Sequence, residues 1–175
     1  ILSHAPDLVG VSATTSGFPD GYALARRIKR AAPETRLIFG GVHVSSLGKQ
    51  LLEDFQEIDY LCLGEGETTL SELAAGNPPS AIHGLAWRDG PNPVTNPPRA
   101  HIPDLDVLPF PAYEKLSGFP EAYHLPLFSF IDRPGATMVT SRGCVYRCSY
   151  CDRSVFRQGF RSHSADYVYE HMRYL

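Results

Sequence analysis

Short apolar runs alternate with amphipathic segments through the first 76 residues. The apolar runs have the length of buried parallel strands and predict strands at Asp7–Ser12, Arg36–Phe39 and Asp59–Leu63. The segments after them carry apolar residues at helical spacing and predict helices at Tyr22–Ala32, Leu47–Phe55 and Thr68–Ala75. Strands separated by single helices imply a parallel sheet with right-handed crossovers. We therefore expect residues 1–76 to form an α/β domain, part of a Rossmann-like, doubly wound parallel sheet.

Prolines become dense over residues 77–134, where the regular alternation stops. Ile82–Arg88, followed by Asp89-Gly90, predicts a small hairpin. The remaining residues of this segment include enough Phe, Tyr and Leu to pack against other parts of the protein. We expect an ordered connector that packs against its neighbours, because a free linker would contain fewer aromatic residues.

A strand, a loop and a helix are predicted over residues 135–175. Ala136–Thr140 is the strand, and a cysteine-containing loop follows it directly. Ser164 then caps a helix that begins near Ala165, with an apolar face made of Val168, Met172 and Leu175. This order predicts the first β/α unit of a barrel, a fold whose functional sites lie where the strands end.

The overall composition is that of a globular protein, with 43% hydrophobic residues and a formal net charge of −3. The slight negative charge weighs against a nucleic acid or an anionic membrane as partner. No apolar run approaches the length of a membrane span, and no secretory signal opens the sequence. Because the chain starts at Ile1 and ends inside a helical pattern at Leu175, we expect a fragment of a longer protein.

Three of the four cysteines lie close together, as Cys144, Cys148 and Cys151 in a C-x3-C-x2-C pattern. Clustered cysteines favour a metal in a reducing compartment over a disulfide framework, so we expect a cytoplasmic protein. Thiolates hold iron–sulfur clusters, and three of them leave one iron of a 4Fe–4S cluster open to a small molecule. A structural zinc site is the alternative, but it needs four ligands, and His163 and Cys62 are not at a usual spacing. Three inert buried cysteines are a further alternative.

Small residues follow the ends of all three predicted strands in the first domain. They are Ser12 and Thr14 at the first strand, Gly40 and Gly41 at the second, and Gly64 and Gly66 at the third. His43 and Glu65 lie beside these glycines. Such residues let a large ligand approach the backbone at the carboxyl edge of a parallel sheet, although glycines at these places also serve tight turns. A histidine that follows two glycines, such as His43, is at least as typical of a loop or helix-capping residue as of a ligand. Cys62 lies within an apolar strand and is expected to be a small buried hydrophobic residue.

The segment Thr140–Asp152 resembles the cluster loop of the radical S-adenosylmethionine superfamily, including the aromatic Tyr150 before the third cysteine. The resemblance implies that Cys144, Cys148 and Cys151 bind three irons of a 4Fe–4S cluster and that S-adenosylmethionine chelates the fourth, with Tyr150 near its adenine. It also implies that an electron from the cluster splits a carbon–sulfur bond of S-adenosylmethionine to give a 5′-deoxyadenosyl radical. Nearby arginines either offset the thiolate charge or form a solvated basic face, and they are Arg142, Arg147, Arg153, Arg157 and Arg161.

Residues from about Pro6 to Ala75 resemble the cobalamin-binding domain that precedes many radical S-adenosylmethionine barrels, and the Pro-rich connector is similar too. The resemblance implies that Ser12 and Thr14 contact the nucleotide tail of cobalamin and that Gly40 and Gly41 make room for it. His43 and the loop of Gly64, Glu65 and Gly66 would border the same cleft. The implied domains are a cobalamin-binding domain at 1–76, a connector at 77–134 and the start of the barrel at 135–175.

These resemblances imply a radical S-adenosylmethionine methyltransferase that uses methylcobalamin to methylate an unactivated carbon or phosphorus. The implied partners are a small-molecule or natural-product substrate and an electron donor such as flavodoxin or ferredoxin. Three alternatives stay open. They are radical cyclisation or rearrangement, a radical enzyme whose first domain is only a scaffold, and a non-catalytic iron–sulfur or metal-binding module.

Overall fold

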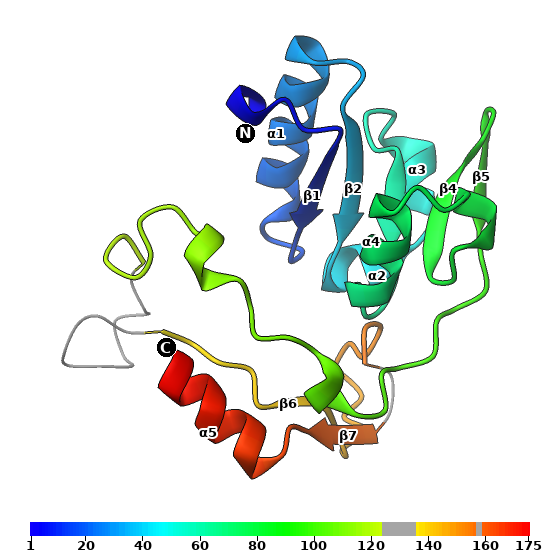
Figure 1. Cartoon of the computed structure of the whole chain (residues 1–175). Coiled ribbons are helices and arrows are strands. Elements are labelled where there is room, and N and C mark those ends of the chain that lie inside the picture. The colour runs from blue at the N-terminus through cyan, green and yellow to red at the C-terminus, as the bar shows by residue number, and fades with distance from the viewer. Residues whose placement is uncertain (124–135, 157–158) are drawn as a thin grey trace. The chain divides into compact units, whose positions relative to one another are not determined.

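The computed structural model describes residues 1–123, 136–156 and 159–175 (Figure 1). These residues form two compact units, one made of Ile1–His101 and Tyr146–Arg157 and the other of Ile102–Val145 and Gln158–Leu175. The end of the predicted connector, 124–134, and Arg157 of the predicted basic flank lie outside the described residues. Within the described part of the chain, no helix is both long and apolar enough to cross a lipid bilayer.

The first unit contains a sheet with strand order β1-β2-β3-β4-β5. Strands β1 (Leu8–Ser12), β2 (Arg36–Gly40) and β3 (Tyr60–Cys62) are parallel. Strand β4 (Leu85–Asp89) pairs antiparallel with β3, and β5 (Asn92–Thr95) pairs antiparallel with β4. The three predicted parallel strands and the predicted hairpin are therefore confirmed. Pro93 lies in the edge strand β5, where a residue without a backbone N–H is tolerated.

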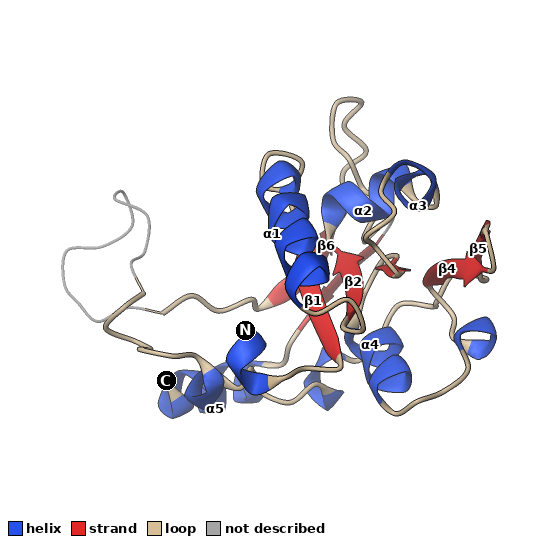
Figure 2. Cartoon of the chain, turned by 90° about the horizontal axis from the view of Figure 1, so that it is seen from above, coloured by secondary structure: helices blue, strands red, loops and turns tan. Residues whose placement is uncertain are grey.

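Successive side chains of the central strands point to opposite faces of the sheet, and helices cover both faces. Leu37 and Phe39 of β2 share one buried cluster with α1 (Phe18–Ala31), α2 (Val42–Leu47) and α3 (Gln50–Asp54). Ile38, between them in sequence, belongs to a second cluster, against which α4 (Glu67–Ala74) packs Leu73. Figure 2 shows these helices around the strands. Helices on both faces of a mainly parallel sheet give the predicted Rossmann-like α/β fold.

Two helices differ from their predicted bounds. Helix α1 begins at Phe18, four residues before the predicted start at Tyr22, and carries a proline in its first turn, where no backbone N–H is needed. The single helix predicted around Leu47–Phe55 is wrong. The chain forms α2 and α3 instead, and Gly48 separates them with a φ of +62°, a conformation that glycine adopts without steric cost.

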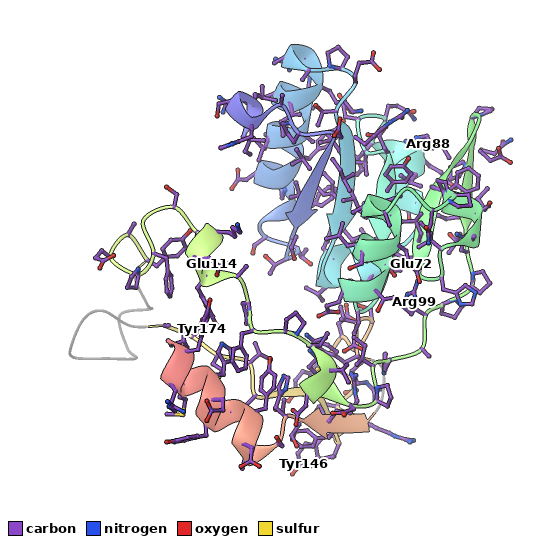
Figure 3. All side chains as sticks on the ribbon, in the orientation of Figure 1. Glu72, Arg88, Arg99, Glu114, Tyr146 and Tyr174 are labelled. Carbon is purple, nitrogen blue, oxygen red and sulfur yellow. The ribbon has the colours of Figure 1, made fainter. Side chains whose placement is uncertain are left out.

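Two arginines fasten the hairpin and the chain after it to the parallel part of the sheet (Figure 3). The Arg88 guanidinium donates to the carbonyl oxygens of Leu52 and Phe55 at the end of α3. Arg99 forms an ion pair with Glu72 of α4 and donates from Nε to Thr69 Oγ1 at 2.9 Å. The residues up to His101 thus pack as one body with the parallel strands.

The second unit contains an antiparallel pair of strands, β6 (Ser141–Cys144) and β7 (Gly159–Ser162), followed by α5 (Ala165–Tyr174). The strand predicted at Ala136–Thr140 is wrong, because those residues form no regular element and the strand begins at Ser141. A strand forms where a partner strand offers backbone hydrogen bonds. Here the partner is β7, which the apolar pattern of the sequence did not predict. Cys144 is therefore the last residue of a strand.

Helix α5 starts as predicted, since Ser164 Oγ accepts a hydrogen bond from Tyr167 N at 3.1 Å. Its predicted apolar face is wrong. Met172 is 62% exposed, whereas His171 is 3% exposed and lies parallel to the ring of Phe110, with their centroids 4.7 Å apart. A stacking aromatic partner makes histidine the buried residue of this helix.

The described residues of the connector from Ile102 on pack within the second unit. Its short 3₁₀ turns are Leu105–Val107 and Tyr113–Lys115. The Asp106 carboxylate accepts hydrogen bonds from Ser164 N at 3.0 Å and lies 3.1 Å from His163 Nδ1. The Tyr174 hydroxyl donates to Glu114 at 3.0 Å (Figure 3). These contacts join the connector to both ends of α5, and the hydrogen bonds from Ser164 and His163 lower the pKa of Asp106.

We predict that Asn96→Ala destabilises the first unit by roughly 2–4 kcal/mol, because it leaves buried polar groups without partners. The Asn96 amide donates to the carbonyls of Pro79 and Ile82 at 2.6 and 2.8 Å and accepts from Trp87 Nε1 at 3.2 Å. Urea unfolding followed by the fluorescence of Trp87, the one tryptophan, measures the change. Asn92→Ala, at an exposed position of the same hairpin, is the control and should cost less than about 0.5 kcal/mol. Equal costs would contradict the prediction.

Candidate functional site

The carboxyl ends of the three parallel strands meet at one edge of the sheet. Ser12 pairs in register with Gly40, so the loops after β1 and β2 start side by side. Ala13 N continues the pairing by donating to Gly40 O at 3.0 Å. The loop after β3 carries Gly64, Glu65 and Gly66. The structure thus brings the predicted residues of the first domain to the same edge.

Gly41 is the residue that lets the first two loops pack so closely. Its φ is +96°, and a Cβ atom there would lie 2.8 Å from Ala13 O and 3.1 Å from Ser12 Oγ. A larger residue would meet backbone that cannot move away cheaply. Gly40 and Gly41 therefore place no side chain next to Ser12, and both Ser12 and Thr14 are exposed at this edge.

His43 lies in the first turn of α2 and connects the first two loops. Its Nδ1 is 3.2 Å from Thr15 Oγ1, and its ring centroid is 4.5 Å from that of Phe18. These contacts give His43 a role in holding the loops together. Thr15 was not among the predicted residues, although a second hydroxyl beside Thr14 was visible in the sequence.

The second and third loops are joined by Ser45, which sequence reasoning also missed. Ser45 Oγ accepts a hydrogen bond from Gly64 N at 3.0 Å, and Gly64 has a φ of +84°. Gly66 leaves room for the thiol of Cys62, since a Cβ there would lie 3.1 Å from that sulfur. Glu65 is 7% exposed, so its carboxylate has little surface to offer a ligand.

The edge as a whole offers exposed hydroxyls and bare glycine backbone. Ser12 and Thr14 supply hydroxyls that can donate and accept, and Gly40, Gly41 and Gly64 place no side chain between them. Uncharged polar groups with open backbone at the carboxyl edge of a parallel sheet fit a large polar ligand better than a small ion. The residues present therefore fit the nucleotide-bearing tail of a corrinoid.

The three clustered cysteines are all exposed, Cys144 at the end of β6 and Cys148 and Cys151 in the following loop. Cys151 N donates to Cys148 O at 3.2 Å, which makes a tight turn between them, and Tyr150 in that turn is 90% exposed. Three exposed thiols suit an iron–sulfur cluster chemically. Among the residues that the structure describes, however, no three His, Cys, Asp or Glu side chains are placed to hold a metal ion. The ligand set stays a prediction.

The chain after Cys151 lies against the sheet edge within the first unit. Ser154 Oγ donates to Val42 O at 3.3 Å, and the hydroxyl of Ser46 bonds to the carboxylate of Asp152. Asp152 also accepts from Ser154 N at 2.6 Å. These hydrogen bonds, with that from Ser154 N the largest cause, lower the pKa of Asp152. No sequence signal predicted this contact.

His163, the nearby candidate for a zinc ligand, is engaged elsewhere. Its ring lies 3.9 Å from that of Tyr167 and its Nδ1 faces Asp106, and its side chain is 6% exposed. These contacts belong to the start of α5 and leave little of the imidazole available to a metal.

Comparison with known proteins indicates what this chain is similar to. The family model described as "B12 binding domain" matches residues 1–74. An uncharacterised methyltransferase of Pyrococcus horikoshii is 31% identical over 180 residues, which cover 100% of this chain and 38% of the relative. The cobalamin-dependent radical SAM methyltransferase TokK of Streptomyces tokunonensis is 30% identical over 152 residues, or 84% of this chain and 22% of TokK. Residues 1–74 thus match the B12-binding domain family, and a relative that aligns with most of this chain is named a cobalamin-dependent radical SAM methyltransferase.

Other relatives of this chain have different names. The anaerobic magnesium-protoporphyrin IX monomethyl ester cyclase of a Synechocystis species is 28% identical over 163 residues, or 89% of this chain and 31% of the cyclase. The structure of the radical S-adenosylmethionine methyltransferase TsrM from Kitasatospora setae superposes with a TM-score of 0.68 at 23% identity, covering 97% of this chain and 34% of TsrM. That likeness shows the fold alone, and it agrees with the Rossmann-like α/β domain. The chain spans less than two-fifths of the length of each of these proteins.

We predict that Cys62 resists alkylation while the clustered cysteines of the metal-free protein react. Cys62 is 7% exposed, and burial raises the pKa of its thiol to about 11. At pH 8 about one thiol in a thousand would be the reactive thiolate. Mass spectrometry after iodoacetamide treatment should show Cys148 and Cys151 labelled roughly a hundredfold faster than Cys62. In urea the rates should become equal, and fast labelling of Cys62 in the folded protein would contradict the prediction.

We predict that Gly143→Ala lowers the iron content of the reconstituted protein, because it separates β6 from β7 next to Cys144. A Cβ at Gly143 would lie 2.0 Å from Gly159 O, at a φ of +90°. Gly159→Ala is the matched control, with a φ of +94° but no atom within 4 Å of the added Cβ. The control should cost about 1–2 kcal/mol from its backbone conformation alone and keep its iron. Iron and sulfide assays after anaerobic reconstitution measure the cluster content of the two variants. Equal iron in both would contradict the prediction.

Proposed function

We propose that this chain belongs to an enzyme that holds a 4Fe–4S cluster with S-adenosylmethionine and binds cobalamin in order to transfer a methyl group by radical chemistry. The observation that carries the proposal is the presence, in one chain, of a match to the B12-binding domain model over residues 1–74 and of a C-x3-C-x2-C thiol triplet. The segment after the triplet contacts that edge through Ser154 and Asp152. Names and chemistry of the relatives support the same reaction class.

Cys144, Cys148 and Cys151 would hold the cluster, since their thiols are exposed and lie within one short stretch of the chain. When bound, the cluster and S-adenosylmethionine supply the radical, and methylcobalamin supplies the methyl group. The exposed ring of Tyr150 is free to cover an adenine by stacking. Basic residues beside the cysteines, such as Arg153, offset the negative charge that thiolates bring to a cluster.

At the sheet edge, Ser12 and Thr14 would hydrogen bond to the polar tail of cobalamin. Gly40 and Gly41 would make room for that tail, and Gly64 would border the same cleft. His43 would keep the first two loops together through Thr15. Gly66 preserves the loop conformation by accommodating the Cys62 thiol. Glu65 is the weakest member of the predicted set because it is buried.

Methyl transfer is the favoured reaction because three of the similar proteins are named methyltransferases. The name of one of them, TokK, includes both cobalamin and the radical SAM class. Radical cyclisation is the second candidate, and the similarity to the magnesium-protoporphyrin ester cyclase favours it specifically. In either case the substrate would be a small molecule or natural product, and flavodoxin or ferredoxin would supply electrons.

We predict that the whole protein, after anaerobic reconstitution and desalting, keeps close to one cobalamin per chain and changes its cluster spectrum with S-adenosylmethionine. Absorbance measures the cobalamin, and electron paramagnetic resonance of the reduced cluster measures the second effect. Gly41→Val should lower the affinity for cobalamin at least roughly ninefold, because the added side chain would clash with the backbone of Ala13 in the first loop. This factor is equivalent to about 1.3 kcal/mol. Gly76→Val is the control, with a positive φ of +81° but open space around its Cβ.

Each failure has a separate meaning. A folded protein that keeps its cluster but no cobalamin would reduce the first domain to a scaffold. A cluster that ignores S-adenosylmethionine would instead indicate a non-catalytic iron–sulfur module. Product analysis with S-adenosylmethionine carrying a labelled methyl group then separates the two reactions, because only methyl transfer puts the label into the product.

A further inference from the structure

The segment from Asp152 to Val155 lies against the same helix that supports the cobalamin edge. Ser154 Oγ donates to the carbonyl oxygen of Val42, the first residue of α2, at 3.3 Å. Ser46, one turn further along α2, lies close enough to the Asp152 carboxylate for its hydroxyl to lower the pKa of that group. Val155 O lies 3.8 Å from where a Cβ on Gly64 would stand. All these residues belong to the first compact unit.

Helix α2 thereby contacts two segments of the chain at once, the third edge loop and the segment that follows Cys151. Ser45 accepts from Gly64 N and fixes the third edge loop, whereas the adjacent Ser46 holds the segment that follows Cys151. The helix itself begins directly after Gly41, whose backbone is pressed against Ala13. A ligand that orders the edge loops must therefore also order the start of α2, and with it the attachment point of the cysteine loop.

The attachment of that loop is built from side-chain hydrogen bonds and not from a buried apolar core. Cys148 and Cys151 are exposed, as are Val145, Tyr146 and Tyr150 around them. Asp152 is internally braced by the bond from Ser154 N at 2.6 Å, so the two residues move as one turn. Single hydrogen bonds of this kind contribute little free energy. The stability of the loop attachment therefore depends on how well α2 itself is ordered.

We propose that Asp152 and Ser154 are positioning residues that couple the two cofactor sites, an inference that rests on the proposed function. Corrinoid at the sheet edge holds α2, α2 holds Asp152 and Ser154, and these hold the loop that carries Cys148 and Cys151. Coupling between two sites is reciprocal, so an assembled cluster loop strengthens corrinoid binding by the same factor. Asp152 and Ser154 act through the loop and do not touch the reacting atoms.

The test compares hydroxocobalamin affinity in the whole protein with and without its cluster. The cluster should strengthen binding in the wild type, and this ratio should fall by roughly two- to tenfold for each hydrogen bond removed by Ser46→Ala or Ser154→Ala. The cluster-free variants should bind hydroxocobalamin as the cluster-free wild type does, because the edge residues are unchanged. Ser71→Ala is the matched control, since it removes an exposed serine bond to Glu67 O in α4, away from the loop.

Hydrogen exchange gives a readout that does not depend on the affinity ratio. Hydroxocobalamin should slow the exchange of backbone amides in 146–156 of the wild type and of Ser71→Ala, and should slow it less in Ser46→Ala and Ser154→Ala. Equal ratios and equal slowing in all four proteins would overturn the coupling while leaving cobalamin binding intact. Weaker hydroxocobalamin binding by the same factor with and without the cluster would also overturn it, because it would mean damage to the edge. A wild type that keeps its cluster but binds no hydroxocobalamin would overturn the proposed function together with this inference.

Discussion

The in-register parallel pairing of β1 with β2 is the constraint on which the rest of the first unit depends. Because Ser12 stands opposite Gly40, the two strands end together, and the chain must turn away from the sheet twice within a few ångströms. Ala13 N reaches Gly40 O at 3.0 Å, and this approach leaves no space for a side chain at Gly41. The glycine pair, the exposed hydroxyls of the first loop and the start of α2 all follow from that one closure.

Helix α2 carries the consequences of this closure from one loop to the next. It is short, ending at Leu47 before Gly48. His43 faces Thr15, Ser45 faces Gly64 and Ser46 faces Asp152. Three neighbouring polar residues thus join three separate segments of chain, which is why a change at the sheet edge is expected to reach the cysteine loop.

The cysteines of this protein illustrate how surroundings separate chemically identical groups. Cys62 lies in β3 between Ile38, Ile82 and Leu85, where burial raises the pKa of its thiol and suppresses its reactivity. The cysteines of the C-x3-C-x2-C pattern are exposed and follow a strand whose partner, β7, must approach Gly143 at backbone distance. The first thiol serves packing, and the others are available to a metal.

The sequence by itself determined the strands of the parallel sheet, the hairpin, the cap at Ser164 and the cysteine pattern, because each depends on residues close together in the chain. Apolar runs, a turn dipeptide and a capping hydroxyl act locally, so their signals survive without knowledge of the fold. The sequence also indicated that Ser12, Gly40 and Gly64 share an edge, since parallel strands align their carboxyl ends.

Tertiary structure alone decided the features that depend on a distant partner. The strand at Ser141–Cys144 exists because Gly159–Ser162 pairs with it, and His171 is the buried residue of α5 because Phe110 stacks on it. The bonds of Thr15, Ser45 and Ser46 join segments that no periodicity relates. A single polar side chain carries no sign in the sequence of which far backbone atom it will meet, and only the folded chain supplies that neighbour.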